Sequence, residues 1–258
     1  VPVRLFLALL FLLPAPAVRA QAAPTARPYP ILFVTQVPLP YDFANIVSTF
    51  GNQRADVQSV PRGGDLWILY PDDTLKNLTA AAGYGSTDPG GFQGANAIAV
   101  RDPALSWDGS KAVFSMVIGA PARQWQVDTY YWQLYEMAGL GQTQTPVITK
   151  VPFQPANTNN IMPVYGPDDR ILFISDRARN GAAHLSPQLD EYELADSNSG
   201  LWRLDPLTGD LRLLDHSPSG DFHPLVDSFG RVLFTRWDHM QRDQEADPQR
   251  DAARGASR

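Results

Sequence analysis

The hydrophobic residues of this chain fall in short runs rather than in long helical stripes. The runs are rich in β-branched and aromatic residues, and Pro, Gly, Asp or Asn bounds most of them, which is typical of β-strands joined by tight turns. The pattern therefore predicts an all-β fold of antiparallel hairpins. The predicted strands lie at 31–35, 65–70, 75–79, 111–118, 129–135, 145–149, 170–175, 200–205 and 210–214.

One motif occurs three times along the chain. It starts at a Pro, turns at an acidic residue or Gly, passes a basic residue, and enters a strand that contains Phe and ends near Ser or Thr. The copies span 103–115, 163–175 and 224–235. Their Phe residues are about 60 positions apart, which indicates a repeated structural unit. These residues are Phe114, Phe173 and Phe234.

A set of Trp residues recurs with nearly the same period as the motif. Trp67, Trp132 and Trp202 recur at a similar spacing, and we expect them at equivalent positions of each unit. Units of four short antiparallel strands around a common axis form a β-propeller, whose repeated aromatic residues pack between neighbouring blades. The alternative is a β-sandwich built from irregular hairpins. Two independent features with one period favour the propeller.

The number of units is too small for a closed ring. Three units precede a fourth that opens at 232–238, whereas propellers close with about four to eight blades. We therefore expect an incomplete ring of about three blades plus a strand, belonging to a larger protein or assembling with a partner, because open sheet edges promote aggregation. Residues 31–238 form the blades, and the charged segment 239–258 is expected to be disordered.

The first twenty residues have the pattern of a secretory signal. Arg4 precedes an apolar run at 5–13, and small residues surround the expected cleavage after Ala20. The run is too short to span a bilayer. A buried core helix and an uncleaved anchor are the alternatives. We expect a periplasmic or secreted chain with an Ala- and Pro-rich linker at 21–30 and no membrane span after removal of the signal.

The composition of the chain excludes several kinds of site and argues against one kind of partner. The 258 residues carry a net charge of −6 and include no Cys. The acidic total argues against a nucleic-acid partner. Without Cys, the chain forms no disulfide, thiolate metal site or covalent c-type haem attachment. The sequence also has no nucleophile elbow, zinc-protease motif or phosphate-binding loop. We therefore assign no catalytic residue and favour binding to a protein or ligand.

The candidate ligand-binding residues lie near the strand predicted at 232–238, which opens the fourth unit. Arg236, Trp237, Asp238 and His239 end that strand, and His223 lies shortly before it. A cation, an indole and an imidazole together suit an anionic or planar ligand. The alternatives are strand-end packing with an Arg–Asp pair, or a hydrolase or lyase that uses the two His and Asp238.

Paired carboxylates occur in two predicted turns. Asp72–Asp73 and Asp168–Asp169 are adjacent in sequence, so their side chains point apart and are expected to cap backbone amides. We expect no metal or other cofactor. The alternatives are Ca²⁺ at these Asp-rich turns and a divalent metal held by His216, His223 and His239 with the Asp residues near them.

Several stretches resemble known families. Residues 106–115, 171–177 and 201–214 resemble the repeat of TolB-like (WD-repeat-like) propellers, although Asp169 replaces the turn Gly in the second copy and Phe229 replaces the turn Asp in the third. The resemblance covers 31–237. Within that class, 63–67, 130–136, 179–185 and 234–239 are similar to hydrazine synthase α subunit-like proteins.

The second resemblance implies a propeller domain within a larger periplasmic protein. The alternative that follows from it is a multidomain haem-containing redox enzyme whose catalytic parts lie outside this chain. The resemblance does not imply hydrazine chemistry for the chain itself, because the Cys-x-x-Cys-His motif that attaches haem is missing.

Overall fold

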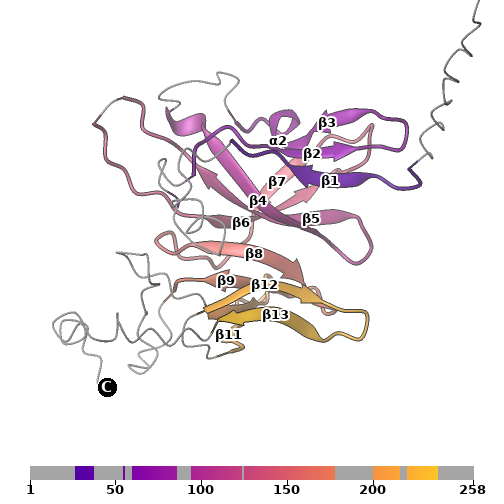
Figure 1. The fold of residues 1–258 in the computed structure, drawn as a ribbon, viewed down its shortest axis with the longest axis vertical. Helices are drawn as coiled ribbons and strands as arrows, with labels where there is room; N and C mark the ends of the chain where they lie inside the picture. The colour runs from indigo at the N-terminus through magenta and orange to yellow at the C-terminus, as the bar shows by residue number, and fades with distance from the viewer. Residues whose placement is uncertain are drawn as a thin grey trace, which may run out of the picture.

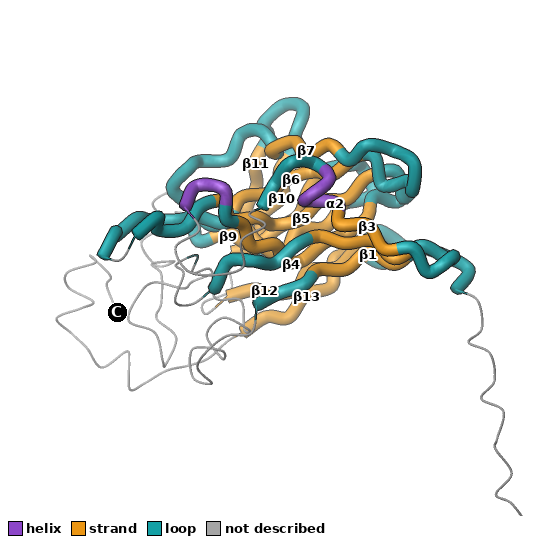
Figure 2. The backbone as a smooth tube through the Cα atoms, turned by 90° about the horizontal axis from the view of Figure 1, so that it is seen from above, coloured by secondary structure: helices purple, strands orange, loops and turns teal. Residues whose placement is uncertain are grey.

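The structure is a computed structural model that describes residues 27–37, 55, 60–85, 94–123, 125–177, 200–215 and 220–237. Within these ranges the chain forms thirteen strands and two short helical segments. Figure 2 shows that strands make up the body of the molecule and that helix is confined to α2 (Leu78–Ala81) and a 3-10 turn at Gly94–Asn96. No helix in the described part of the chain combines the length and the apolar character needed to cross a membrane.

The strands form four antiparallel sheets in chain order (Figure 1). Two sheets have four strands, the first has three, and the last has two. The first comprises β1 (Ile31–Val34), β2 (Leu66–Leu69) and β3 (Leu75–Asn77), and the second comprises β4 (Ile98–Leu105), β5 (Lys111–Ile118), β6 (Gln133–Ala138) and β7 (Val147–Lys150). The third comprises β8 (Asn160–Tyr165), β9 (Ile171–Ser175), β10 (Gly200–Leu204) and β11 (Leu211–Leu213), and the last comprises β12 (Gly220–Val226) and β13 (Val232–Trp237).

The sheets follow one another across the molecule like blades of an open ring. The first strand of each later sheet lies against the first strand of the sheet before it, so that β4 contacts β8 and β8 contacts β12. Figure 1 shows this succession from β1–β3 to β12–β13. The predicted all-β, propeller-like fold with an incomplete ring is therefore confirmed for the described residues.

The repeated motif is the hairpin between the first two strands of a sheet, at β4–β5, β8–β9 and β12–β13. Strands β4, β8 and β12 run through the Pro that we expected to open the motif. The thirteen strands therefore divide into two complete and two partial blades.

The aromatic repeat also needs one correction. In the first and third sheets, Phe33 pairs with Trp67 and Phe173 pairs with Trp202. In the second sheet, the partner of Phe114 is Tyr135, and the two rings stack with centroids 6.2 Å apart. Tyr135 rather than Trp132 thus occupies the equivalent position, and β6 begins later than the predicted 129–135.

The core consists of clusters between neighbouring sheets. Phe114 packs between the first and second sheets and Phe173 between the second and third, and both are fully buried. Phe234 is 36% exposed, so its predicted place in the core was wrong. The reason is that no third strand lies beside β13 in the described residues.

Two further points concern the predicted elements. The predicted strand at 75–79 ends at Asn77, because the Asn77 side chain accepts a hydrogen bond from the Ala80 amide at 2.9 Å and starts α2. The predicted signal segment 1–20 and the tail 239–258 lie outside the described residues, so both stay predictions.

Candidate functional site

The first strands of three sheets carry the same irregularity. At each, the pairing register shifts so that two residues, of which the second is Pro, lie opposite one Phe. This is a β-bulge, and Pro suits it because the extra residue has no ladder bond to donate. The bulged pairs are Asp102–Pro103, Met162–Pro163 and His223–Pro224, opposite Phe114, Phe173 and Phe234.

The residue before each Pro has a left-handed backbone. The φ angles are 52° at Asp102, 54° at Met162 and 49° at His223. For a residue with a Cβ, this conformation costs about 1–2 kcal/mol. The same cost recurs at three equivalent positions with unrelated side chains. The bulge is therefore a property of the repeat rather than of one local sequence.

Hydrogen bonds join the three bulges in series. The Met162 amide donates to Asp102 Oδ2 at 3.2 Å, and the His223 amide donates to Met162 Sδ at 3.2 Å. Asp102 and Met162 thus each accept, through their side chains, the backbone N–H of the next bulge. We call Asp102, Met162 and His223 the bulge ladder. It links the innermost strands β4, β8 and β12.

The surroundings of the ladder change along its length. Met162 has a sheet on both sides and is 2% exposed, whereas His223 belongs to the last described sheet and is exposed. Asp102 Oδ2 also accepts from Arg101 Nε at 2.7 Å, and the Arg101 guanidinium lies 5.5 Å from the centroid of the Trp132 ring. The ladder is therefore fixed at its Asp102 end and open at its His223 end.

A cavity of about 230 Å³ lies beside the ladder. His223, Arg101, Asp102 and Trp132 contribute to its wall, together with Gln36 after β1. The wall thus combines a cation, a carboxylate, an indole and an imidazole. Because Arg101 and Asp102 bind each other, both charges already stabilise the inner strands.

The structure places two of the five predicted binding residues in different settings. His223 lies in the cavity wall, whereas Arg236 on β13 forms an ion pair with Asp215, with 3.6 Å between Nη1 and Oδ1. This is the Arg–Asp pairing expected under the packing alternative. Asp238, His239 and the side chain of Trp237 lie outside the described residues, so a ligand site there stays a prediction.

The sequence analysis missed Asp102 and Met162 as site residues. A signal for them was present, because an Xaa–Pro pair recurs about 60 residues apart just before each turn motif. The predicted motif begins at the Pro, one residue later. The residue before Pro is the one whose side chain reaches the neighbouring blade.

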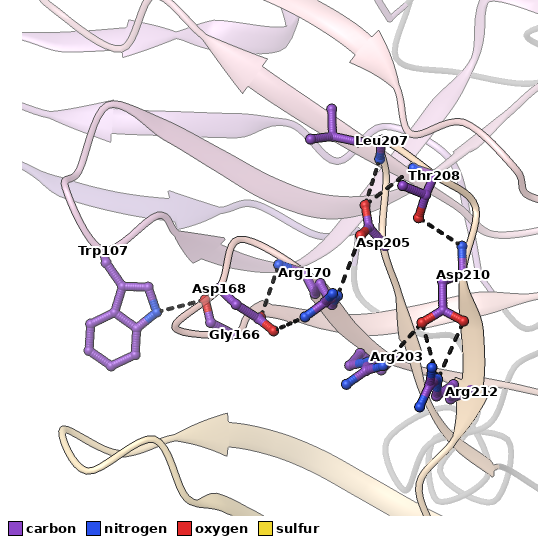
Figure 3. Close-up of polar contacts among 10 residues, drawn as sticks. All are labelled: Trp107, Gly166, Asp168, Arg170, Arg203, Asp205, Leu207, Thr208, Asp210 and Arg212. Atoms are coloured by element: carbon purple, nitrogen blue, oxygen red, sulfur yellow. Dashed lines mark hydrogen bonds and ion pairs between the residues drawn. The ribbon is translucent and has the colours of Figure 1, made fainter.

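The hairpin ends make further contacts, one between the second and third sheets and others within the third sheet (Figure 3). Trp107 Nε1, in the β4–β5 hairpin, donates to the Gly166 carbonyl in the β8–β9 hairpin at 3.2 Å. Arg170 binds Asp168 in its own turn and lies 3.5 Å from Asp205 Oδ2 in the β10–β11 hairpin. The turn carboxylates therefore serve to fix hairpins.

Of the four Asp side chains in the two predicted turns, Asp72 and Asp168 accept backbone hydrogen bonds, as expected, with the Arg170 amide 3.3 Å from Asp168 Oδ1. Asp205 does the same in the β10–β11 hairpin. Asp205 accepts from the Leu207 amide at 2.9 Å, and this bond holds the pKa of Asp205 below its usual range. Asp72 Oδ1 accepts from the Thr74 amide at 3.1 Å. In the described residues, no group of three or more His, Asp or Glu side chains could hold a metal ion. Ca²⁺ at these turns stays a prediction.

The fold is similar to that of a solved structure. No family model matches the chain, and no curated protein matches it. The chain is similar to a structure of Kuenenia stuttgartiensis hydrazine synthase, with 15% sequence identity and a TM-score of 0.50. The match covers 80% of this chain and 27% of that chain. At this identity the likeness shows the fold alone, and it supports a propeller-like module.

Proposed function

We propose that this chain is an exported propeller-like module that binds another protein segment and forms part of a larger protein. The observation that carries the proposal is the apolar surface of the two-stranded sheet β12–β13. Leu225 is 50% exposed, Leu233 is 48% exposed and Phe229 is 81% exposed. Leu225 and Leu233 pair across the two strands, and Phe229 lies in the turn that joins them. Exposed apolar side chains grouped on one hairpin are a common feature of binding surfaces.

The polar groups beside this sheet favour binding over catalysis. Arg101 and Asp102 are committed to each other, and Asp102 also accepts the Met162 amide. A general acid or base needs a carboxylate or imidazole that faces a substrate with its proton available. Asp102, bound by Arg101, instead joins β4 to β8 through the Met162 amide. Export rests on the predicted signal at residues 1–20.

A second candidate is a scaffold domain of a multidomain haem-containing redox enzyme. The likeness to hydrazine synthase favours it, because the chain spans 27% of that protein. The chain contains no Cys, so its residues do not fit a covalently attached haem. Under this candidate, any haem is held elsewhere, and the chain contributes binding surfaces only.

Site-specific photo-crosslinking in the native cells tests the binding role. A photoreactive phenylalanine analogue at position 233 is expected to give a discrete covalent adduct with a protein partner. The same analogue at position 147 is the matched control, because Val147 is 56% exposed on the outer strand β7. Equal labelling at the two positions, or none at 233, contradicts the proposal.

Export is tested separately. Residues 1–20 fused to alkaline phosphatase, which is active only outside the cytoplasm, are expected to give enzyme activity. A fusion with two Arg placed inside the apolar run 5–13 is the matched control and is expected to be inactive. An inactive parent fusion that is present in full amount in the cytoplasm contradicts a periplasmic or secreted location.

A further inference from the structure

We propose that the open face of β12–β13 binds a further β-sheet of the same repeat, whose first strand has an Xaa–Pro bulge and donates its bulge amide to the His223 imidazole. This inference rests on the proposed function and names the chemistry of the partner. It is drawn from the way each described sheet binds the sheet that follows it.

The second sheet shows which side chains face a following sheet. On β5, Val113 is fully buried in a cluster with Tyr165, Ile171 and Phe173 of the third sheet. Its partner across the β4–β5 ladder, Ala104, packs against the same cluster. These two register positions therefore form the contact with the next sheet.

The equivalent positions in the last sheet are apolar and exposed. They are Leu225 and Leu233, which pair across β12–β13 as Ala104 and Val113 pair across β4–β5. Leu172, the equivalent residue on β9, is 4% exposed, whereas Leu233 is 48% exposed. The same position is thus buried in the second and third sheets, each of which is followed by another sheet. The β12–β13 face therefore continues an established interface.

The bulge ladder also indicates which polar group the partner must supply, namely a backbone amide as hydrogen-bond donor. Asp102 accepts the Met162 amide through a carboxylate oxygen, and Met162 accepts the His223 amide through a thioether sulfur. An imidazole nitrogen without its proton is also a hydrogen-bond acceptor. His223 therefore has the chemistry to accept one more amide of the same kind, which a sheet presents only when its first strand carries the bulge.

This requirement selects against a second copy of the chain as the partner. The first sheet begins with β1, whose Phe33–Trp67 pairing matches the Phe173–Trp202 pairing of β9 and β10. β1 is thus equivalent to a second strand. Among the described residues this sheet has no bulged first strand to offer His223. A head-to-tail dimer would cover the leucines and leave the ladder unextended.

The test extends the full chain by one repeat. A second copy of residues 177–237 is added directly after Trp237, which supplies two strands to complete the fourth blade and a new bulged hairpin. The added copy carries His223→Met, so that the two peptides differ in mass and only the original one has an imidazole at position 223; fragment ions separate His223 from His216 of the same peptide. The probe is diethyl pyrocarbonate, and mass spectrometry of the peptide gives the modification rate of His223.

Diethyl pyrocarbonate is expected to modify His223 at least tenfold more slowly in the extended chain than in the parent chain. Two variants of the extended chain are the controls. Leu233→Asp in the original copy is expected to restore the parent rate by blocking the face. Replacement of the added Met–Pro pair by a single Val removes the bulge, and is expected to restore part of the rate while the sheet still docks.

An unchanged His223 rate in the extended chain overturns the inference, as does an added segment that trypsin removes while the original blades stay intact. If the extended chain is insoluble, a synthetic peptide of residues 158–177, the β8–β9 hairpin, is added to the parent chain. Slower modification of His223 then supports the inference, and an unchanged rate overturns it.

The two proposals fail separately. A discrete crosslink at position 233 in cells, with no protection of His223 in the extended chain, leaves the binding role standing and removes the partner chemistry. Protection of His223 in the extended chain, with no crosslink in cells, supports the partner chemistry and removes the binding role in the native cells.

Discussion

The repeated Phe residues provide the sharpest test of the open-ring architecture. Phe173 is fully buried between two sheets, and Phe234 occupies the same position in the last sheet with 36% exposure. Removal of a buried Phe side chain costs about 3–5 kcal/mol, because the lost transfer energy is joined by the cost of a cavity. At Phe234, part of the ring is already in water and the space left behind is open, so we expect about 1–2 kcal/mol for Phe234→Ala.

Urea unfolding followed by tryptophan fluorescence measures both losses. The free energy of unfolding is extrapolated from the linear dependence on urea, and circular dichroism must give the same transition for a two-state treatment. Phe114→Ala is the matched control, because Phe114 is as fully buried as Phe173. Similar losses for Phe173→Ala and Phe234→Ala would refute the reasoning, because they would mean that the Phe234 ring is buried as fully as the Phe173 ring.

Three further predictions follow from single contacts. Hydrogen bonds, the strongest from the Ser106 hydroxyl, lower the pKa of Asp108 to about 2. The Asp108 carboxylate therefore contributes stability above about pH 4 that is lost as the pH falls towards 2. Asp108→Asn is expected to reduce the pH dependence of the melting temperature between these two pH values. Gly139→Ala is expected to destabilise the chain more than Gly83→Ala in urea unfolding, because both have positive φ but only the Gly139 Cβ would lie 2.2 Å from a carbonyl oxygen. Asp102→Ala is expected to cost about 2–4 kcal/mol in the same assay, and Asp102→Asn less, because Asn keeps an acceptor for the neighbouring amide.

Much of the blade architecture could be predicted because its signals are local. The turn at Ser106–Lys111 closes through backbone bonds and the Asp108 side chain, all within six residues. Asp169 takes the place of a turn Gly with φ at 59°, as the sequence comparison of the motifs indicated. Turn chemistry and alternating hydrophobic residues therefore place the hairpins without knowledge of the tertiary fold.

The alignment of the aromatic repeat could not be predicted from spacing. Trp132 lies close to the expected interval, yet pairing across β5–β6 puts Tyr135 opposite Phe114. The irregular segment before β6 changes the number of residues between the strands, and residue counting does not detect this. Strand register is decided by pairing and burial.

The bulge ladder was missed for a different physical reason. A Pro within a hydrophobic run reads as a strand boundary, but β4, β8 and β12 accommodate it at a bulge. The contacts that define the ladder join residues about 60 positions apart, and no local pattern specifies them. One of the acceptors, the Met162 sulfur, is also a residue type that usually indicates only packing.

The most direct measurement is the identity of the residues crosslinked to position 233 in the native cells. The account predicts an adduct with a strand of a further blade, in a sequence where an Xaa–Pro pair precedes a tight turn and a strand that contains Phe. An adduct with a helical or otherwise unrelated segment, or labelling no stronger than at position 147, would contradict it.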